Sequence, residues 1–202
     1  MMQWWFNKKS NYPAFYKRYL ERIQDEGWSK HILAFDMETS GIEVKSADIL
    51  SFGSIPIIHG KILAKQEKHL FFHSSAHQKE NILIHELFAH TYDKALDDYI
   101  EVIMDTLSNH VLLGHFVEFD IALVNRQLSK LKLPKLRNPS LDTLKMAMKK
   151  DGIHSFAYAK RTDYTLYTLC ERFEIDVEFT HDALYDAYLT ALLYLHLEDK
   201  SS

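Results

Sequence analysis

The chain has 202 residues, of which 47% are hydrophobic and 26% charged, with a formal net charge of −4. These values fit one globular domain with a sizeable core, and no apolar run approaches the roughly 20 residues that span a bilayer. Residues 1–10 contain Trp4, Trp5 and Phe6 but lack the features of a signal peptide. The single cysteine, Cys170, cannot form an internal disulfide, so we expect a reducing, cytoplasmic setting, with Cys170 on a buried helix face.

The first predicted element is a helix over residues 14–23, which Pro13 begins, within an N-terminal helical extension of residues 1–30. The apolar run 32–35 then predicts a buried strand that leads directly into Asp36.

Two further strands, residues 48–58 and 61–72, are predicted to form a hairpin that turns at His59 and Gly60. Pro56 lacks a backbone N–H, which favours an edge strand or a position late in its strand. A strand at 111–113, another within 136–141 despite Pro139, and several helices follow; the helices cover residues 94–107, 118–131, 141–149, 166–173 and 183–197. This order predicts an α/β fold with a mixed central sheet, three antiparallel strands followed by parallel strands, flanked by helices.

Charge is unevenly distributed along the chain. Residues 126–161 contain ten basic and two acidic residues, so this segment carries +8 and the remainder −12. The segment is either a solvated basic face or a surface that attracts phosphate groups.

The first acidic motif is Asp36-Met37-Glu38-Thr39, at the end of the first predicted strand. Side chains two apart on a strand share one face, so Asp36 and Glu38 can point together at the edge where α/β folds place their sites. An Asp-x-Glu pattern alone is also common among surface charges. In the second motif, residues 114–120, Asp120 lies near a helix start, where it either stabilises the first turn or faces the same site.

The third acidic motif, residues 181–187, brings His181 and Asp186. Asp186 interrupts an apolar helix, where an unpaired carboxylate is costly, so it either meets water at the helix boundary or binds a metal. His181 can approach Asp186 only from the preceding loop, and Thr180 is a candidate N-cap for the helix. A histidine in such a loop can serve as a base near neutral pH.

Together the three motifs resemble the DEDDh, or DnaQ-like, family of 3′-5′ exonucleases, represented by the exonuclease domain of the DNA polymerase III epsilon subunit. Residues 36–42 match the family's D-x-E-T-[TS]-G-[LI] pattern, and residues 181–187 match H-x-A-x-x-D-A. The tyrosine subgroup would have tyrosine where this chain has Asp182. The resemblance covers about residues 32–197 and implies a ribonuclease H-like exonuclease domain over residues 31–199.

The resemblance implies a two-metal mechanism with Mg²⁺ or Mn²⁺ as cofactors. Asp36, Glu38 and Asp186 would hold one ion, Asp36 and Asp120 the second, and His181 would be the base. Substrate would lie against the segment after the first strand and the second motif, through Thr39, Gly41, Ile42, His115 and Phe116, with Ile42 as an apolar wedge.

The second motif departs from the family pattern, which has G-H-N where this chain has Phe116 in the third position. That side chain either stacks on a nucleobase or packs in the core, and packing is the expected outcome.

The implied activity is release of 5′-mononucleotides from the 3′ end of single-stranded DNA, in replication, repair or proofreading, with a DNA polymerase as a candidate partner. Two alternatives stay open: an enzyme that trims RNA 3′ ends, because nothing in the motifs reads a 2′-hydroxyl, and a nucleic-acid-binding module without catalysis.

Overall fold

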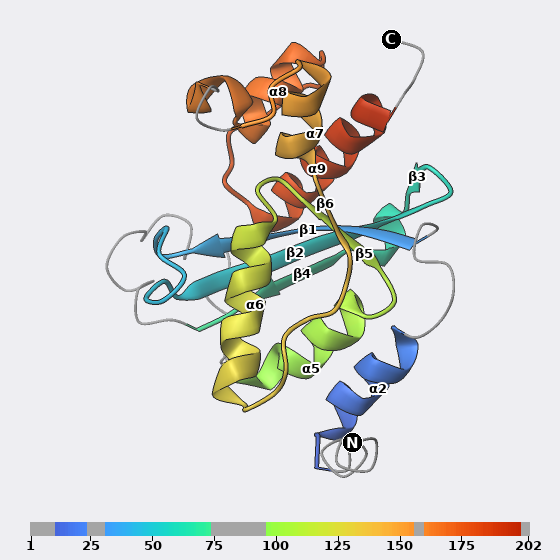
Figure 1. Cartoon of the computed structure of the whole chain (residues 1–202), viewed down its shortest axis with the longest axis vertical. Helices are drawn as coiled ribbons and strands as arrows, with labels where there is room; N and C mark the ends of the chain where they lie inside the picture. Colours follow the sequence, from blue (N-terminus) through green and yellow to red (C-terminus); the bar gives the residue numbers. More distant parts are fainter. Residues whose placement is uncertain (1–10, 24–30, 74–95, 156–159, 199–202) are drawn as a thin grey trace.

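The computed structural model describes residues 11–23, 31–73, 96–155 and 160–198 (Figure 1). Over this part of the chain, six strands form one sheet in the order β3-β2-β1-β5-β6, with β4 also paired to β2. The strands are β1 (His31–Thr39), β2 (Ile49–Ile58), β3 (Lys61–Ile62), β4 (Lys68–Phe71), β5 (Val111–Gly114) and β6 (Ser140–Asp142). The helices are α2 (Ala14–Arg22), α5 (Leu96–Leu107), α6 (Glu118–Lys130), α7 (Thr143–Lys150), α8 (Leu166–Arg172) and α9 (Ala183–Glu198), with short 3-10 helices η2 (Ala64–Gln66) and η4 (Arg161–Tyr164).

Strand pairing confirms the predicted mixed sheet. β2 pairs antiparallel with β1, β3 and β4. β5 pairs parallel with both β1 and β6. Because β1, β5 and β6 run in one direction, their carboxyl ends meet at one edge of the sheet, and the segments that follow them gather there.

The predicted strand 61–72 is wrong as one continuous element. It is divided into β3 and β4 by η2, whose residues 64–66 are all exposed. The edge position suggested by Pro56 is also wrong, because β2 lies inside the sheet. Pro56 is tolerated late in β2, where the outer partner changes from β4, paired to Ser54, to β3, paired from Ile57.

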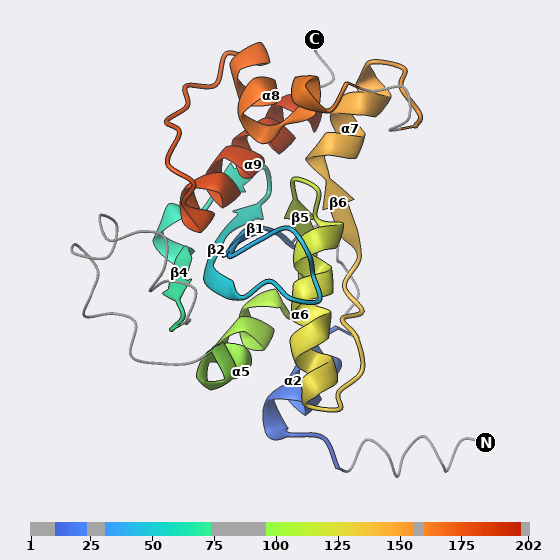
Figure 2. The same ribbon diagram turned by 90° about the vertical axis from the view of Figure 1, so that its left-hand side faces the viewer.

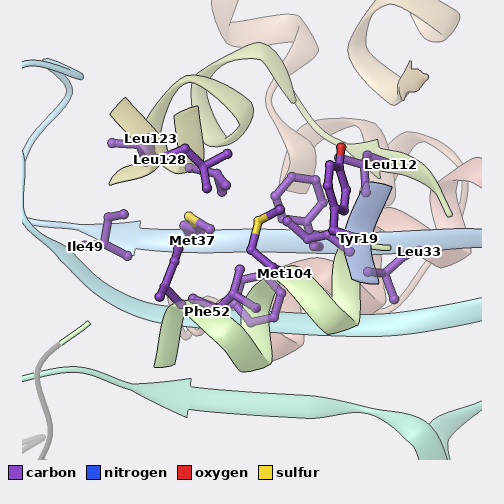
Figure 3. Packing of buried hydrophobic residues seen from close by; sticks show 14 of the residues in the cluster. Tyr19, Leu33, Met37, Ile49, Phe52, Met104, Leu112, Leu123 and Leu128 are labelled. Carbon is purple, nitrogen blue, oxygen red and sulfur yellow. The ribbon is translucent and has the colours of Figure 1, made fainter. Parts of the chain in front are cut away.

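Side chains of β1 alternate between two cores. Leu33, Phe35 and Met37 pack with α2, α5 and α6 on one face (Figure 3). Ile32 and Ala34 pack on the other face with side chains of α9. Asp36 and Glu38 have the parity of Ile32 and Ala34, so they continue the face that α9 covers. Figure 2 shows the same layering, with α9 on one side of the sheet and α5 and α6 on the other.

The start of α9 approaches β2 very closely at Gly53. A Cβ added to Gly53 would lie 2.2 Å from the backbone carbon of Ala183 and from the backbone nitrogen of Leu184. Glycine is therefore required here, since any side chain would push α9 away from the sheet.

The N-terminal helix α2 packs into the main core. Tyr16 and Tyr19 are fully buried, and both reach the connection between α6 and β6. The Tyr16 hydroxyl donates to the Pro134 carbonyl at 3.1 Å, and the Tyr19 hydroxyl donates to Asn138 Oδ1 at 2.7 Å. The helix thus closes one end of the core.

The remaining helix predictions agree with the structure to within two residues. The predicted helix 94–107 begins partly outside the described residues, and α5 is described from Leu96. The predicted start of helix 141–149 shifts to Thr143, because Leu141 and Asp142 belong to β6 and Asp142 caps α7. None of the helices in the described ranges is both long and apolar enough to span a membrane.

Candidate active site

Asp36 and Glu38 lie at the end of β1, on the face covered by α9. Burial raises the pKa of Asp36 well above its usual value, and the charges of Asp120, Asp186 and Glu38 raise it further. Burial, followed by the charge of Asp186, raises the pKa of Glu38 to about 7. The sequence-predicted carboxylates therefore lie close enough to repel one another.

Asp120, in the first turn of α6, is buried although its side chain is ionisable. Burial raises its pKa, and backbone hydrogen bonds, one of them from Met37 on β1, oppose the rise. Met37 lies between the two carboxylates of β1, so Asp120 reaches the site from α6, the helix that follows the neighbouring parallel strand β5. Asp120 therefore faces the same site as Asp36, and its role as a metal ligand stays a prediction.

Asp186 and His181 come from the α9 region. Asp186 is 9% exposed and lies in the first turn of α9, while His181 lies in the preceding loop with a φ of 46°. The predicted N-cap, Thr180, is wrong: Asp182 takes this role, since its Oδ1 accepts a hydrogen bond from the Tyr185 N–H at 2.9 Å. This cap leaves His181 outside the helix, so its side chain is free to turn toward Asp186.

Glu38, His181 and Asp186 each offer a ligand atom, and these atoms all lie within 4.8 Å of one another. The two carboxylates of this cluster offer the oxygen ligands that suit Mg²⁺ or Mn²⁺, and a bound cation would relieve the repulsion that raises the carboxylate pKa values. The cluster contains Glu38 and Asp186 of the first metal site that the resemblance implied, with His181 where Asp36 was expected as the third ligand. Its chemistry fits a divalent cation. Asp36 and Asp120 belong to the same electrostatic cluster.

The turn after β5 is fixed by its own hydrogen bonds. His115 Nδ1 lies 2.9 Å from the Thr143 hydroxyl, and His115 Nε2 lies 2.9 Å from the Tyr164 carbonyl oxygen. Burial lowers the pKa of His115 to about 4, so the ring is neutral and joins this turn to α7 and η4. Substrate contact by His115 stays a prediction, and it would have to use the carbon edge of the ring.

Phe116 corrects the expectation of core packing. Its side chain is 50% exposed, and its backbone has a φ of 62°, a conformation that asparagine adopts more readily than phenylalanine. The Phe116 N–H donates to Asp142 Oδ1 at 3.0 Å, and the same oxygen caps α7 through the Leu144 N–H. These bonds hold the strained residue in place and leave its ring available to a ligand.

The segment after β1 presents the other predicted substrate residues. The Thr39 hydroxyl donates to the Gly41 carbonyl at 2.8 Å, which folds the segment into a turn. Ile42 follows and is 91% exposed. This exposure leaves the side chain of Ile42 accessible to a ligand, and its role as an apolar wedge stays a prediction.

Two structural contributors were missed by sequence reasoning. The Tyr167 hydroxyl donates to Asp186 Oδ1 at 2.7 Å. Burial and this hydrogen bond raise the pKa of Tyr167, so its hydroxyl keeps its proton. Gly53 sets the distance between α9 and the sheet. Neither residue has a local sequence signal, because each acts on a partner from another segment. Cys170, by contrast, is buried as predicted, and burial raises its thiol pKa to about 12.

A family model described as "Exonuclease" (RNase_T) matches residues 33–194. The chain is similar to DNA polymerase III PolC-type of Bacillus subtilis (strain 168), with 29% identity over 171 residues that cover 82% of this chain and 11% of that protein. It is also similar to DNA polymerase III subunit epsilon of Aquifex aeolicus (strain VF5), with 26% identity over 181 residues that cover 87% of this chain and 84% of the relative. This chain thus spans about a tenth of the PolC-type relative and most of the epsilon relative.

Among solved structures, the fold is similar to E. coli Exonuclease I in complex with a 5cy-dT13 oligonucleotide. The TM-score is 0.61 with 17% sequence identity, covering 85% of this chain and 41% of that one. At this identity the likeness concerns the fold, which is ribonuclease H-like as the sequence predicted.

Proposed function

Because the chain belongs to the DnaQ-like family of 3′-5′ exonucleases, we propose that it removes 5′-mononucleotides from the 3′ end of single-stranded DNA in a metal-dependent reaction. The observation that carries the proposal is the convergence of four carboxylates and one histidine from β1, α6 and the start of α9. We place the exonuclease domain at residues 31–199, after an N-terminal helical extension of residues 1–30.

We assign Asp36, Glu38, Asp120 and Asp186 to two divalent cations, Mg²⁺ or Mn²⁺. When bound, such cations stabilise the charge on the attacking and leaving oxygens of an in-line displacement. The protein supplies their ligands from three rigid elements, so the carboxylates are held in place before substrate binds.

His181 is our candidate for the base that takes the proton of the attacking water. A ring nitrogen of His181 lies within 4.8 Å of the carboxylates of Glu38 and Asp186, and its exposed loop position gives access to solvent. After bond cleavage the imidazolium can return its proton to solvent. Transfer through a positioned side chain of this kind contributes roughly 10²–10⁴-fold to a rate.

Substrate recognition in this proposal uses apolar and basic surfaces. Thr39, Gly41 and Ile42 would contact the terminal nucleotide on one side, and His115 and Phe116 on the other. The basic segment contributes exposed side chains on α6 and α7, including Lys130, Lys149 and Lys150, although Lys145 is already paired with Glu118. Such a surface attracts a phosphate backbone.

The direct test is digestion of matched 5′-labelled DNA and RNA single strands by the purified chain, with Mg²⁺, Mn²⁺ or EDTA. We expect metal-dependent shortening of DNA from its 3′ end, release of 5′-mononucleotides, and loss of activity in His181→Ala. The matched control is His196→Ala, an exposed histidine on α9 whose Nδ1 contacts the Leu192 carbonyl.

Each other outcome separates the alternatives. Shortening of RNA in preference to DNA would favour an RNA-trimming enzyme. Metal-dependent thermal stabilisation without turnover of either strand would favour a binding module. A role beside a DNA polymerase rests on the names of the relatives, and co-purification with a polymerase subunit from the source cells would test it.

A further inference from the structure

Tyr167, on α8, makes three contacts at the junction between α8 and the loop that precedes α9. Its hydroxyl donates to Asp186 Oδ1 at 2.7 Å. Its ring stacks on Phe179, with centroids 4.8 Å apart and an interplanar angle of 23°. The same ring meets the edge of His181, with centroids 5.9 Å apart and an angle of 67°.

These contacts join two groups that the site must hold in a fixed relation. Asp186 is on α9, whereas His181 is in the loop, so the α9 backbone does not fix the imidazole. Phe179 and His181 flank Thr180 in the sequence, and both contact the ring of Tyr167. A single side chain from a third element therefore touches the carboxylate and both flanks of the loop.

The hydroxyl also leaves Asp186 equipped for a cation. A carboxylate has two oxygens, and Tyr167 occupies only Oδ1. A neutral donor bound to Oδ1 restricts rotation of the carboxylate. The second oxygen, Oδ2, then stays available to a cation. Partners that orient metal ligands in this way commonly change metal affinity or activity by about 10–100-fold when they are removed.

We propose that Tyr167 is a positioning residue, whose hydroxyl orients Asp186 toward a divalent cation and whose ring holds the His181 loop. The proposal rests on the proposed function in that it takes Asp186 as a ligand and His181 as the base. It assigns one role to each part of the side chain, so the two parts can be tested separately.

The hydroxyl is tested by the affinity of the full chain for Mn²⁺, measured by electron paramagnetic resonance without substrate. We expect Tyr167→Phe to weaken Mn²⁺ binding by about 10-fold. The control is Tyr164→Phe, which removes a similar hydrogen bond from a tyrosine hydroxyl to a carboxylate, Asp151, at 2.6 Å. Wild-type affinity in Tyr167→Phe, equal losses in both variants, or no Mn²⁺ binding by the unaltered chain would overturn the proposal.

The ring is tested by the kinetics of nucleotide release at saturating Mn²⁺. Tyr167→Phe keeps the ring, so its kcat at saturating Mn²⁺ should be close to that of the unaltered chain. Tyr167→Leu lacks the ring, so its kcat should stay at least about 10-fold below that of the unaltered chain. Equal kcat values for the two variants would remove the ring's role. Circular dichroism without metal establishes that each variant is folded.

Failure of this proposal is distinguishable from failure of the proposed function. Mn²⁺ binding is measured without turnover, so a Tyr167→Phe defect would stand even if the unaltered chain cleaved neither DNA nor RNA. Conversely, if the chain is an active exonuclease and Tyr167→Phe leaves its Mn²⁺ affinity unchanged, the proposed function stands and the role of Tyr167 is refuted.

Discussion

In the proposed mechanism Asp36 binds the cations as a carboxylate beside other carboxylates, whereas His181 gains and then loses a proton. The repulsion at Asp36 is a cost to the metal-free chain, because burial and four neighbouring acids all disfavour its charged form. Function and stability are therefore opposed at this residue.

Replacing Asp36 with asparagine separates these two effects. We expect Asp36→Asn to lose more than about 100-fold in kcat, because its ligand charge is gone. The same variant should unfold at a higher temperature than the unaltered chain in EDTA at pH 8, because one repelling charge is removed. Calorimetry and the digestion assay measure the two outcomes. A less stable variant in EDTA would contradict the repulsion.

His181 offers the complementary case. The histidine lies near enough to Glu38 and Asp186 to act as a ligand, but we assign it as the base. His181→Ala should lower kcat by about 10²–10⁴-fold and leave Mn²⁺ affinity in the absence of substrate unchanged. A parallel loss of Mn²⁺ affinity, measured by calorimetric titration, would instead make His181 a metal ligand.

Phe116 predicts a gain in stability. Phe116→Asn should raise the free energy of unfolding by about 1 kcal/mol, because asparagine tolerates a positive φ and the phenylalanine ring is half exposed. Urea unfolding in EDTA measures the change. Phe179→Asn is the control, an exposed phenylalanine outside the positive-φ residues of the described chain, and it should show no gain.

Among the elements, β1 was the most predictable because its pattern is local. Ile32 to Phe35 are all buried, and the two acids follow at the end of the strand, so hydrophobicity alone places the first motif. The break between β3 and β4 was not predictable, because residues 61–72 contain no strong turn signal and the interruption depends on pairing with β2.

Candidate site residues also divide into those that a local sequence pattern predicts and those that depend on contacts between elements. Asp36, Glu38 and Asp186 could be identified from their positions on apolar elements. Tyr167 could not, since its distance to Asp186 depends on how α8 packs against α9. The exposure of Phe116 was also hidden, because a positive φ directs the ring away from the core that its apolar character suggested.

The close approach of α9 to β2 at Gly53 predicts how a substitution there would affect stability. Gly53→Ala should destabilise the chain by about 3 kcal/mol, since the added methyl group would lie 2.2 Å from the α9 backbone. Because α9 carries Asp186, activity should fall even at temperatures where the variant stays folded. Gly41→Ala is the stability control, as nothing lies within 4 Å of its added Cβ. Equal unfolding midpoints for the two variants would contradict the close contact.

For the whole molecule, the raised pKa values link stability to pH and metal. Glu38 has a folded-state pKa of about 7 against an ordinary value of 4.5. Between those values the folded chain binds more protons than the unfolded chain, so the free energy of unfolding falls as pH rises.

We therefore expect the thermal midpoint in EDTA to be lower at pH 8 than at pH 5, by about 2–4 °C for each kcal/mol lost. Saturating Mg²⁺ should reduce this difference, because the cation binds the ionised carboxylates of the folded chain. Differential scanning calorimetry over this range measures both effects. A midpoint in EDTA that rises from pH 5 to pH 8 would contradict the sign.

The hydrogen bonds of α2 to Pro134 and Asn138 also affect how the chain folds during its synthesis. Tyr16 and its partner Pro134 are separated by 118 positions. At a translation rate of about 5–20 residues per second, Pro134 is synthesised roughly 6–24 s after Tyr16. During this interval the hydroxyls of Tyr16 and Tyr19 lack their partners Pro134 and Asn138, so we expect added protease to cleave α2 faster in nascent chains stalled before residue 134 than in longer chains.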